Sequence, residues 1–174
     1  PTFVVIHSTV PVGTTEQITG IQVVHSPIRG KHPYLADSIR TFVKFVGGPS
    51  ESANRVAEYL VNAKINTVTV KDAKTTELMK IVSTTLYGWQ IVACKEVERL
   101  CKEYDVNFDD VYTFPNSTYN KGYEEIGMGQ FRKPYLKAMP GPIGGHCVVQ
   151  NCDLLDDPFT QTVKDYNDIY EIEV

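Results

Sequence analysis

The sequence predicts an α/β protein, in which a partial parallel sheet is followed by an α-helical domain built on one long helix. Three observations support this fold class. Short β-branched runs, each predicted as a strand, occur at residues 3–8, 21–27, 41–48 and 66–70. An amphipathic segment, residues 50–65, separates the last two strands. A second helical pattern continues from about residue 75 to residue 104. Strands and helices that alternate over short links are typical of an α/β layer.

The first strand opens the chain directly, as it would in a segment taken from within a longer protein. Residues 3–8, FVVIHS, are a β-branched run, which predicts a strand buried on both faces, as in a parallel sheet. The turn at 8–15 follows, and we expect a short helix to begin at Thr14 or Thr15.

Turn-forming residues bound the other strands. Pro27 ends the second strand, and residues 29–38 are predicted as a loop because they contain a glycine and a proline. Two glycines close the third strand, 41–48, and Ser50 is expected to cap the helix that follows. The fourth strand, 66–70, alternates enough to lie at a sheet edge. The apolar face of the helix between them carries Val56, Leu60 and Ala63.

The long helix at 75–104 has Thr75 or Thr76 as its expected cap, and Gly88 is the one residue that argues against continuity. At 1.5 Å per residue, about 30 residues span roughly 45 Å. A helix so long, and apolar over more than one face, is predicted to pack against its own domain and against a second subunit. Its apolar stripe comprises Leu78, Val82, Leu86, Trp89, Val92, Val97 and Leu100.

The second half of the chain is less regular. Two further helix starts are predicted, one at Asn107 or Phe108 before an acidic turn, and one at Asp156 or Asp157 in the acidic tail. Residues 114–123 are rich in turn formers and aromatic side chains.

Composition excludes several classes of protein. Apolar residues make up 42% of the chain and charged residues 22%, which is typical of a soluble globular protein. A net charge of −4 gives no general attraction to nucleic acid or to anionic membranes. No apolar run approaches the roughly 18 residues that span a bilayer, and no signal peptide is visible.

The cysteines lack the paired spacing of a zinc site, and we predict no metal site. Cys94 and Cys101 are expected to be small buried apolar residues on the long helix. Free thiols favour a reducing compartment, so we expect a cytoplasmic protein.

Two stretches in the first half could carry chemistry. Residues 7–13 join a strand end to small hydroxyl residues, and open α/β sheets bind ligands at such an edge. The plain alternative is a turn capped by serine and threonine. Lys80 and Thr84 share one helix face. The lysine could hold an oxyanion or orient water, and the alternative is an ordinary surface lysine.

A third stretch, PGPIGGHC at 140–147, ends on a cysteine. Its glycines let the backbone approach a ligand closely. Cys147 is placed to start a helix, where the dipole would favour the thiolate. Exposed amides beside a sulfur are the parts of a nucleophilic site for a carbonyl, whereas the alternative is a packed loop with a buried thiol. His146 is expected to form structural hydrogen bonds rather than to bind a metal.

Together these stretches resemble the UDP-glucose/GDP-mannose dehydrogenase family, the nucleotide-sugar 6-dehydrogenases. The family turn STVPVGTT stands letter for letter at 8–15, and HSPIRGKHP at 25–33 resembles its S-P-E-R-x-x-x-G region. Glu77-Leu78-Met79-Lys80, followed by Thr84, resembles its E-x-x-K-x-x-x-N helix. PGPIGGHCVVQNCDLL at 140–155 resembles its PGPGVGGHCIPVDPYYL loop. The resemblance covers most of the chain, in the same order.

The resemblance implies two domains. Residues 1–73 would be the C-terminal part of a Rossmann-like NAD-binding domain. Residues 74–174 would be the helical central domain, similar to the C-terminal domain of 6-phosphogluconate dehydrogenase, and would form a homodimer through the long helix. The implied activity is NAD-dependent oxidation of the C6 alcohol of a UDP- or GDP-linked sugar to the acid, through a cysteine thiohemiacetal and thioester.

The resemblance also implies roles for single residues. Cys147 would be the nucleophile, Lys80 would steady the oxyanion, and Thr9 would lie near the nicotinamide and water. Arg132 would reach the substrate of a neighbouring subunit. The implied cofactor-binding residues are Ser8, Thr9, Val10 and Pro11. The implied substrate-binding residues are Lys80, Thr84, Arg132, Gly144 and Gly145.

The chain departs from the family pattern at several of these positions. Ile28 stands at the glutamate of S-P-E, Thr84 at the asparagine, Val149 at the proline and Asn151 at the aspartate of the cysteine loop. The glycine loop is one residue shorter than the family's. Loss of a general acid or base costs about 10²–10⁴ in rate. The sequence contains no G-x-G-x-x-G unit, and the segment expected after residue 174 would hold the UDP-binding domain.

Two hypotheses follow. In the first, the chain contributes its cysteine, lysine and threonine to an active nucleotide-sugar dehydrogenase. In the second, it is a truncated or diverged non-catalytic homologue that acts as a dimeric nucleotide-sugar-binding or scaffold module.

Overall fold

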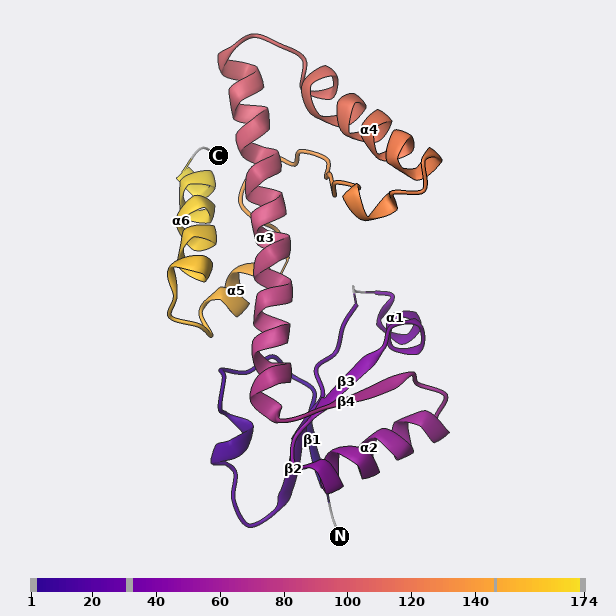
Figure 1. The fold of residues 1–174 in the computed structure, drawn as a ribbon. Helices are drawn as coiled ribbons and strands as arrows, with labels where there is room; N and C mark the ends of the chain where they lie inside the picture. The colour runs from indigo at the N-terminus through magenta and orange to yellow at the C-terminus, as the bar shows by residue number, and fades with distance from the viewer. Residues whose placement is uncertain (1–2, 31–32, 146, 173–174) are drawn as a thin grey trace. The chain divides into compact units, whose positions relative to one another are not determined.

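The computed structural model describes residues 3–30, 33–145 and 147–172. They form two compact units, residues 1–83 and residues 84–174, which divide within the long helix α3 (Ala73–Glu103). The fold class is as predicted, with a mostly parallel sheet and one helix of 31 residues (Figure 1). The predicted domain boundary at residue 73 remains a prediction, and each unit is described by itself.

The described part of the first unit contains a four-stranded sheet in the order β1-β2-β3-β4. The pairs β1–β2 and β3–β4 are parallel, and the central pair β2–β3 is antiparallel. Helix α2 (Ser50–Asn62) lies along one face of the sheet (Figure 1). The strands are β1 (Phe3–Ile6), β2 (Gln22–His25), β3 (Lys44–Gly47) and β4 (Thr67–Val70). The core between them comprises Val24, Val46, Ala53 and Val56, with Phe3, Val5 and Leu60 packed against it.

The prediction that the first strand is buried on both faces is wrong. Strand β1 is an edge strand, and only its Phe3 and Val5 side chains pack against the core with α2. Val4, which alternates to the other face, is exposed. Strand β4 forms the other edge, as its alternation predicts.

A helix was missed between the second and third strands. Residues predicted as loop and strand form α1 (Leu35–Thr41), and β3 therefore begins at Lys44 rather than at residue 41. No described residue of α1 is buried, so it carries no apolar stripe that a pattern could detect. Ser50 is the first residue of α2, and Pro49, not Ser50, precedes the helix without a side-chain cap. The short helix expected near Thr15 is a single turn, η1 (Thr15–Gln17).

Helix α3 begins two residues earlier than expected. Asp72, rather than Thr75 or Thr76, caps it by accepting a hydrogen bond of 2.8 Å from the Thr75 amide. The Thr75 hydroxyl and amide lower the pKa of the Asp72 carboxyl. Only part of the predicted apolar stripe is buried. Val92 is buried, whereas Leu78, Leu86 and Leu100 are 41%, 50% and 42% exposed.

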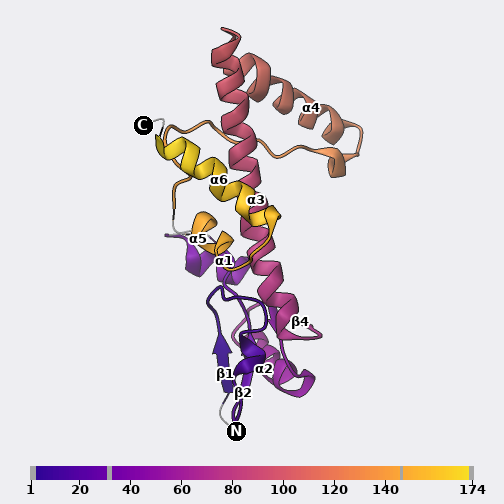
Figure 2. The same ribbon diagram turned by 90° about the vertical axis from the view of Figure 1, so that its left-hand side faces the viewer.

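The second unit packs α5 (Val148–Cys152) and α6 (Pro158–Ile172) beside its part of α3, as both views show (Figures 1 and 2). Gly88 makes this packing close. A Cβ atom there would lie 2.8 Å from a methyl group of Val148 and 2.8 Å from one of Val163. The glycine therefore favours the packing of the unit, although it lowers helix propensity. The core comprises Val92, Ile143, Val148, Cys152, Val163 and Tyr170.

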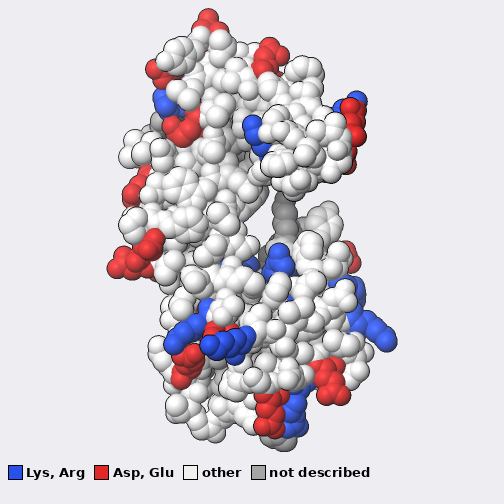
Figure 3. All heavy atoms as spheres, in the orientation of Figure 1, with Lys and Arg blue, Asp and Glu red and all other residues white. Residues whose placement is uncertain are grey.

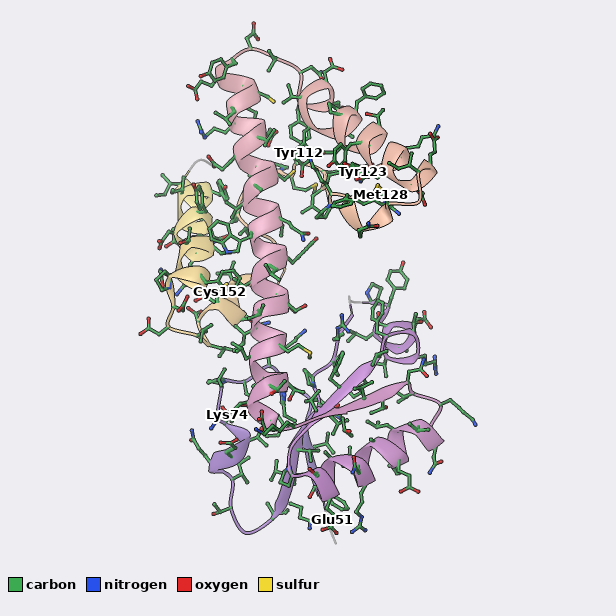
Figure 4. All side chains as sticks on the ribbon, in the orientation of Figure 1. Glu51, Lys74, Tyr112, Tyr123, Met128 and Cys152 are labelled. Atoms are coloured by element: carbon green, nitrogen blue, oxygen red, sulfur yellow. The ribbon has the colours of Figure 1, made fainter. Side chains whose placement is uncertain are left out.

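Residues 114–123 form most of a helix, α4 (Phe114–Glu125), and not the turn-rich stretch that their composition predicts. A π-helical turn, η2 (Asp109–Thr113), leads into α4, and a 3-10 turn, η3 (Gly129–Phe131), follows it. Pro115 lies in the first turn of α4, directly after the π-helical turn η2. Tyr123 contacts Tyr119 and Phe131, and Figure 4 shows Tyr112, Tyr123 and Met128 in this part of the unit.

Two predicted helix starts are confirmed. The Asn107 side chain accepts hydrogen bonds from the amides of Asp109 and Asp110. Asp157 accepts one from the Phe159 amide at the start of α6.

The charged side chains on the surface are of both signs, as the composition indicates. On the face drawn in Figure 3, lysine and arginine side chains are interspersed with aspartate and glutamate. Among the helices in the described ranges, none is long and apolar enough to cross a membrane. The same residues contain no cluster of metal-ligating side chains.

Candidate functional site

In the first unit, the turn at 8–15 is held by one buried carboxylate of α3. Glu77 is 0% exposed, and its Oε2 accepts a hydrogen bond of 2.6 Å from the Gly13 amide. Its Oε1 accepts bonds from the Thr15 amide at 2.9 Å and from the Thr15 hydroxyl at 2.6 Å. Three donors satisfy the charge, as a buried carboxylate requires. Lys74 lies beside η1 and pairs with Glu16 at 2.6 Å (Figure 4).

The predicted cofactor-binding residues form one accessible stretch after β1. Ser8 and Pro11 are exposed, while Thr9 and Val10 are half-buried. The carbonyl oxygen of Ser8 lies 3.0 Å from Nε2 of His25 and accepts a hydrogen bond from it.

Sequence reasoning missed His25, which is fully buried. Because Ser8 accepts from Nε2, we assign the ring proton to that nitrogen, so the Thr76 hydroxyl donates to Nδ1 at 2.8 Å. Burial lowers the pKa of His25, and the bond to Ser8 and the charge of Glu77 partly oppose this. Its position in a β-branched run, IQVVHSP, is the sequence signal that could have indicated a buried histidine.

Lys44 was also missed, although a lysine inside the apolar run TFVKFVGG marks it. It is 7% exposed, and its ammonium donates to the carbonyl oxygens of Ser26 at 2.9 Å and Pro27 at 3.3 Å. Burial first, and then the charge of Lys80, lower the pKa of Lys44 to about 8. The buried hydroxyl of Ser26 has no hydrogen-bond partner among the described residues.

Ile28, which stands where the resemblance expects a glutamate, is half-buried. Its amide donates to the carbonyl oxygen of His7 at 3.2 Å. Its side chain brings no carboxylate to the end of β2.

In the second unit, the glycine loop lies against α3. Lys95 is 8% exposed and donates to the carbonyl oxygens of Met139 at 2.6 Å and Gly141 at 2.5 Å. The Ile143 amide donates to Oδ1 of Asn167 at 2.8 Å. Sequence reasoning missed both side chains, because a lysine or asparagine on an amphipathic helix looks like surface.

Cys147 ends this loop and directly precedes α5, as predicted. It is exposed, whereas the other three cysteines are buried, as expected for Cys94 and Cys101. Burial raises the pKa of the Cys94 and Cys152 thiols. Gly144 is exposed, and the exposed Gly145 has a φ of 88°, a backbone conformation that favours glycine. His146 lies outside the described residues.

Two of the substituted family positions contact each other. Nδ2 of Asn151 donates to the Thr84 hydroxyl at 3.3 Å. The pair is neutral, so it supplies no general base. Arg132 lies elsewhere in the unit, after η3, and its exposed guanidinium is 3.7 Å from the Glu124 carboxylate.

The glycine loop also lines a cavity of about 360 Å³, within the range of small-molecule sites. Helix α3 contributes Tyr87, Ile91, Cys94 and Lys95 to its wall. The remaining lining residues come from the loop, between Leu136 and Gly144.

No protein-family model matches the chain. It is 26% identical over 166 residues to the UDP-N-acetyl-D-mannosamine dehydrogenase of Pyrococcus horikoshii, covering 87% of this chain and 37% of that protein. It is also 26% identical over 171 residues to the NDP-N-acetyl-D-galactosaminuronic acid dehydrogenase of Ralstonia nicotianae, covering 83% of this chain and 36% of that protein. The chain thus spans little more than a third of the length of these relatives.

Solved structures share the fold. The UDP-D-ManNAc dehydrogenase from Pyrococcus horikoshii matches 95% of this chain and 41% of its own, with a TM-score of 0.75 and 23% identity. A UDP-glucose dehydrogenase from Pyrobaculum islandicum matches 96% of this chain and 41% of its own, with a TM-score of 0.69 and 20% identity. The family resemblance in the motifs and the similarity to the curated relatives agree, because both point to the nucleotide-sugar dehydrogenases as the proteins that this chain is similar to.

Proposed function

We propose that this chain provides nucleotide-sugar contacts and the cysteine nucleophile of a dehydrogenase that oxidises the C6 alcohol of a UDP- or GDP-linked sugar to the acid. The observation that carries the proposal is the exposed Cys147 at the end of a glycine loop that is fixed to α3 and lines a cavity. The similarity to the curated UDP-N-acetyl-D-mannosamine dehydrogenase of Pyrococcus horikoshii over 87% of the chain supports it.

Cys147 would act by addition to the aldehyde that forms from the alcohol. Its thiolate would form a bond to the carbonyl carbon, and the negative charge would move to the carbonyl oxygen. Lys80 would steady that oxygen, and the backbone of Gly144 and Gly145 would approach the sugar closely. Thr9 would orient water for hydrolysis of the later thioester.

NAD, when bound, would accept the hydride that leaves the sugar carbon. Ser8 to Pro11 are accessible for contact with its nicotinamide end. This turn does not fit its pyrophosphate, because the amides of Gly13 and Thr15 are taken by Glu77. A buried carboxylate there would repel a phosphate. We therefore assign the pyrophosphate site to another part of the assembly.

A homodimer through α3 is part of the proposal. The exposed Leu78, Leu86 and Leu100 follow one stripe of the helix, and a second copy would cover them. Sedimentation would give a mass near twice 19.5 kDa for a dimer, and 19.5 kDa for a monomer.

A specific observation favours the second hypothesis. Ile28 and Asn151, the latter bonded to Thr84, leave the two acidic positions of the family pattern without a carboxylate. In this alternative, the chain holds a nucleotide sugar without oxidising it.

The test is NADH formation with UDP-glucose, UDP-N-acetyl-sugars and GDP-mannose, on the wild type and on Cys147→Ala. Turnover that disappears in the variant supports the enzyme. An increase in melting temperature with a nucleotide sugar, but no turnover in either protein, supports the binding module. No turnover and no shift in melting temperature would contradict both.

A further inference from the structure

The second unit buries the ammonium group of one lysine beneath its glycine loop. Besides its bonds to Met139 and Gly141, Nζ of Lys95 lies 4.9 Å from the centroid of the Tyr170 ring, which is itself buried. A desolvated cation over an aromatic face is attracted by the electrons of the ring. Burying an ammonium group costs free energy of desolvation unless its protons form hydrogen bonds. The groups that accept those hydrogen bonds therefore indicate the role of the lysine.

Those partners are carbonyl oxygens that have no other regular pairing. Residues 132–145 form neither helix nor strand, and their backbone groups therefore lack the ladder bonds of regular structure. Gly141 has a φ of 75°, and the chain bends at this residue, between the two carbonyl groups that Lys95 holds. An apolar side chain at position 95 would leave both oxygens without this donor.

A second helix fixes the next point of the loop. Asn167 of α6 is 4% exposed, accepts from the Ile143 amide and donates to Glu171 at 3.1 Å. The loop is thus held at residues 139, 141 and 143 from two helices. Immediately beyond the last of these points, Gly144, Gly145 and Cys147 are exposed. The loop therefore has a fixed base and an open tip.

We propose that Lys95 is a positioning residue, which pre-organises the glycine loop so that its tip and Cys147 meet the nucleotide sugar in one geometry. We call the two hydrogen bonds from Lys95 to the carbonyl oxygens of Met139 and Gly141 the clamp. The identity of the ligand rests on the proposed function, whereas the clamp does not. Holding the base in advance spares the ligand the entropy cost of ordering the loop, and so favours binding.

The clamp is tested first by amide hydrogen exchange, without any ligand. Lys95→Met keeps a side chain of similar length and removes the ammonium, while Lys95→Arg keeps a charged donor. Lys102→Met is the matched control, because its side chain on the same helix is 74% exposed and pairs with Glu98. We expect exchange of the Ile143 amide to become about tenfold faster in Lys95→Met, with an intermediate value in Lys95→Arg and no change in the control.

The role in positioning is tested by calorimetric titration with UDP-N-acetyl-D-mannosamine. We expect the Kd to rise about tenfold in Lys95→Met, to recover in part in Lys95→Arg, and to stay unchanged in Lys102→Met. A lysine that only stabilises the fold would lower the melting temperature and leave the Kd of the folded variant unchanged, which would overturn the proposal.

The outcomes separate the two proposals. If the wild type binds no nucleotide sugar but exchange at Ile143 accelerates as expected, the proposed function fails and the clamp stands. Equal exchange at Ile143 in the wild type and in Lys95→Met would overturn the clamp, whatever binds. If Lys95→Met does not fold, Lys95→Arg decides, because exchange at Ile143 must still be faster in that variant than in the wild type, and equal rates would overturn the clamp.

Discussion

The two units of the chain hold their loops with charged side chains of opposite sign from the same helix. In the first unit, Glu77 accepts hydrogen bonds from the backbone amides of Gly13 and Thr15. In the second, Lys95 donates to the carbonyl oxygens of Met139 and Gly141. Both charged groups are buried and satisfied by backbone atoms of a loop.

The difference shows that the sign of the buried charge on α3 matches the backbone groups that the loop directs at the helix. The turn at 8–15 directs N–H groups at the helix, so only an acceptor satisfies them. The glycine loop directs carbonyl oxygens at it, so only a donor does. Glu77 also lies near the N-terminus of α3, where the helix dipole favours a negative charge. The predictions below each change one contact in one unit, and begin with Glu77.

The largest effect is expected at Glu77. Glu77→Gln would place amide protons against the donors of residues 13 and 15, and should lower the free energy of unfolding of the first unit by about 3 kcal/mol. Hydrogen exchange of the β1–β4 amides in urea measures it. The control is Glu16→Gln, which removes only an exposed ion pair. A loss no larger than that of the control would contradict the role of Glu77.

In the second unit, Gly88→Ala should destabilise by about 2 kcal/mol, because the new methyl group would overlap Val148 and Val163. Alanine raises helix propensity, so the sign of the change separates packing from propensity. Gly122→Ala in α4 is the matched control, since no atom lies within 4 Å of its added methyl group. It should stabilise by about 0.5–1 kcal/mol. Thermal melting followed by Trp89 fluorescence would measure both, and equal changes would refute the packing argument.

The buried lysine of the first unit makes stability depend on pH. The pKa of Lys44 is lowered to about 8, so between pH 8 and the ordinary lysine value of 10.5 the unfolded chain binds more protons than the folded chain. Stability contributed by this group therefore rises with pH, by about 1.5 kcal/mol from about pH 8 to about pH 9.5. Urea unfolding at several pH values gives the free energy of unfolding of the wild type and of Lys44→Met. Subtracting one from the other isolates the contribution of Lys44, because the buried thiols titrate in both proteins and their opposing effect cancels. Lys71→Met, at an exposed lysine, should behave as the wild type.

The smallest effect concerns the neutral pair of the second unit. A double-mutant cycle with Thr84→Val and Asn151→Ala should give a coupling free energy of about 0.5 kcal/mol, because a neutral bond of 3.3 Å is weak. A coupling of zero in urea unfolding would show that the two side chains do not interact.

The elements with an apolar period could be predicted, and those without one could not. The pattern from residue 75 to residue 104 predicts α3 to within two residues, and the β-branched runs predict all four described strands. Helix α1 was missed because none of its described residues is buried. Helix α4 was missed because Pro115 and Gly122 suggest turns, whereas Pro115 lies at the start of α4, just after the π-helical turn η2.

The site could be predicted only where a motif marks it. The glycine loop and Cys147 follow from the resemblance, and the start of α5 after Cys147 is confirmed. The motif resemblance marks Glu77 but gives it no role, and Lys95 and Asn167 were missed because they look like surface positions of amphipathic helices. Their burial depends on which loop returns to the helix, and no local pattern carries that information.

The most direct test of the account is the rate at which iodoacetamide alkylates Cys147, read by peptide mass spectrometry with and without UDP-N-acetyl-D-mannosamine. The three buried cysteines serve as internal controls in the same sample. A bound nucleotide sugar at the glycine loop should slow alkylation of Cys147 at least about tenfold, because the thiol would be covered. Equal alkylation rates of Cys147 with and without an excess of the nucleotide sugar would contradict the assignment of Cys147 to a nucleotide-sugar site.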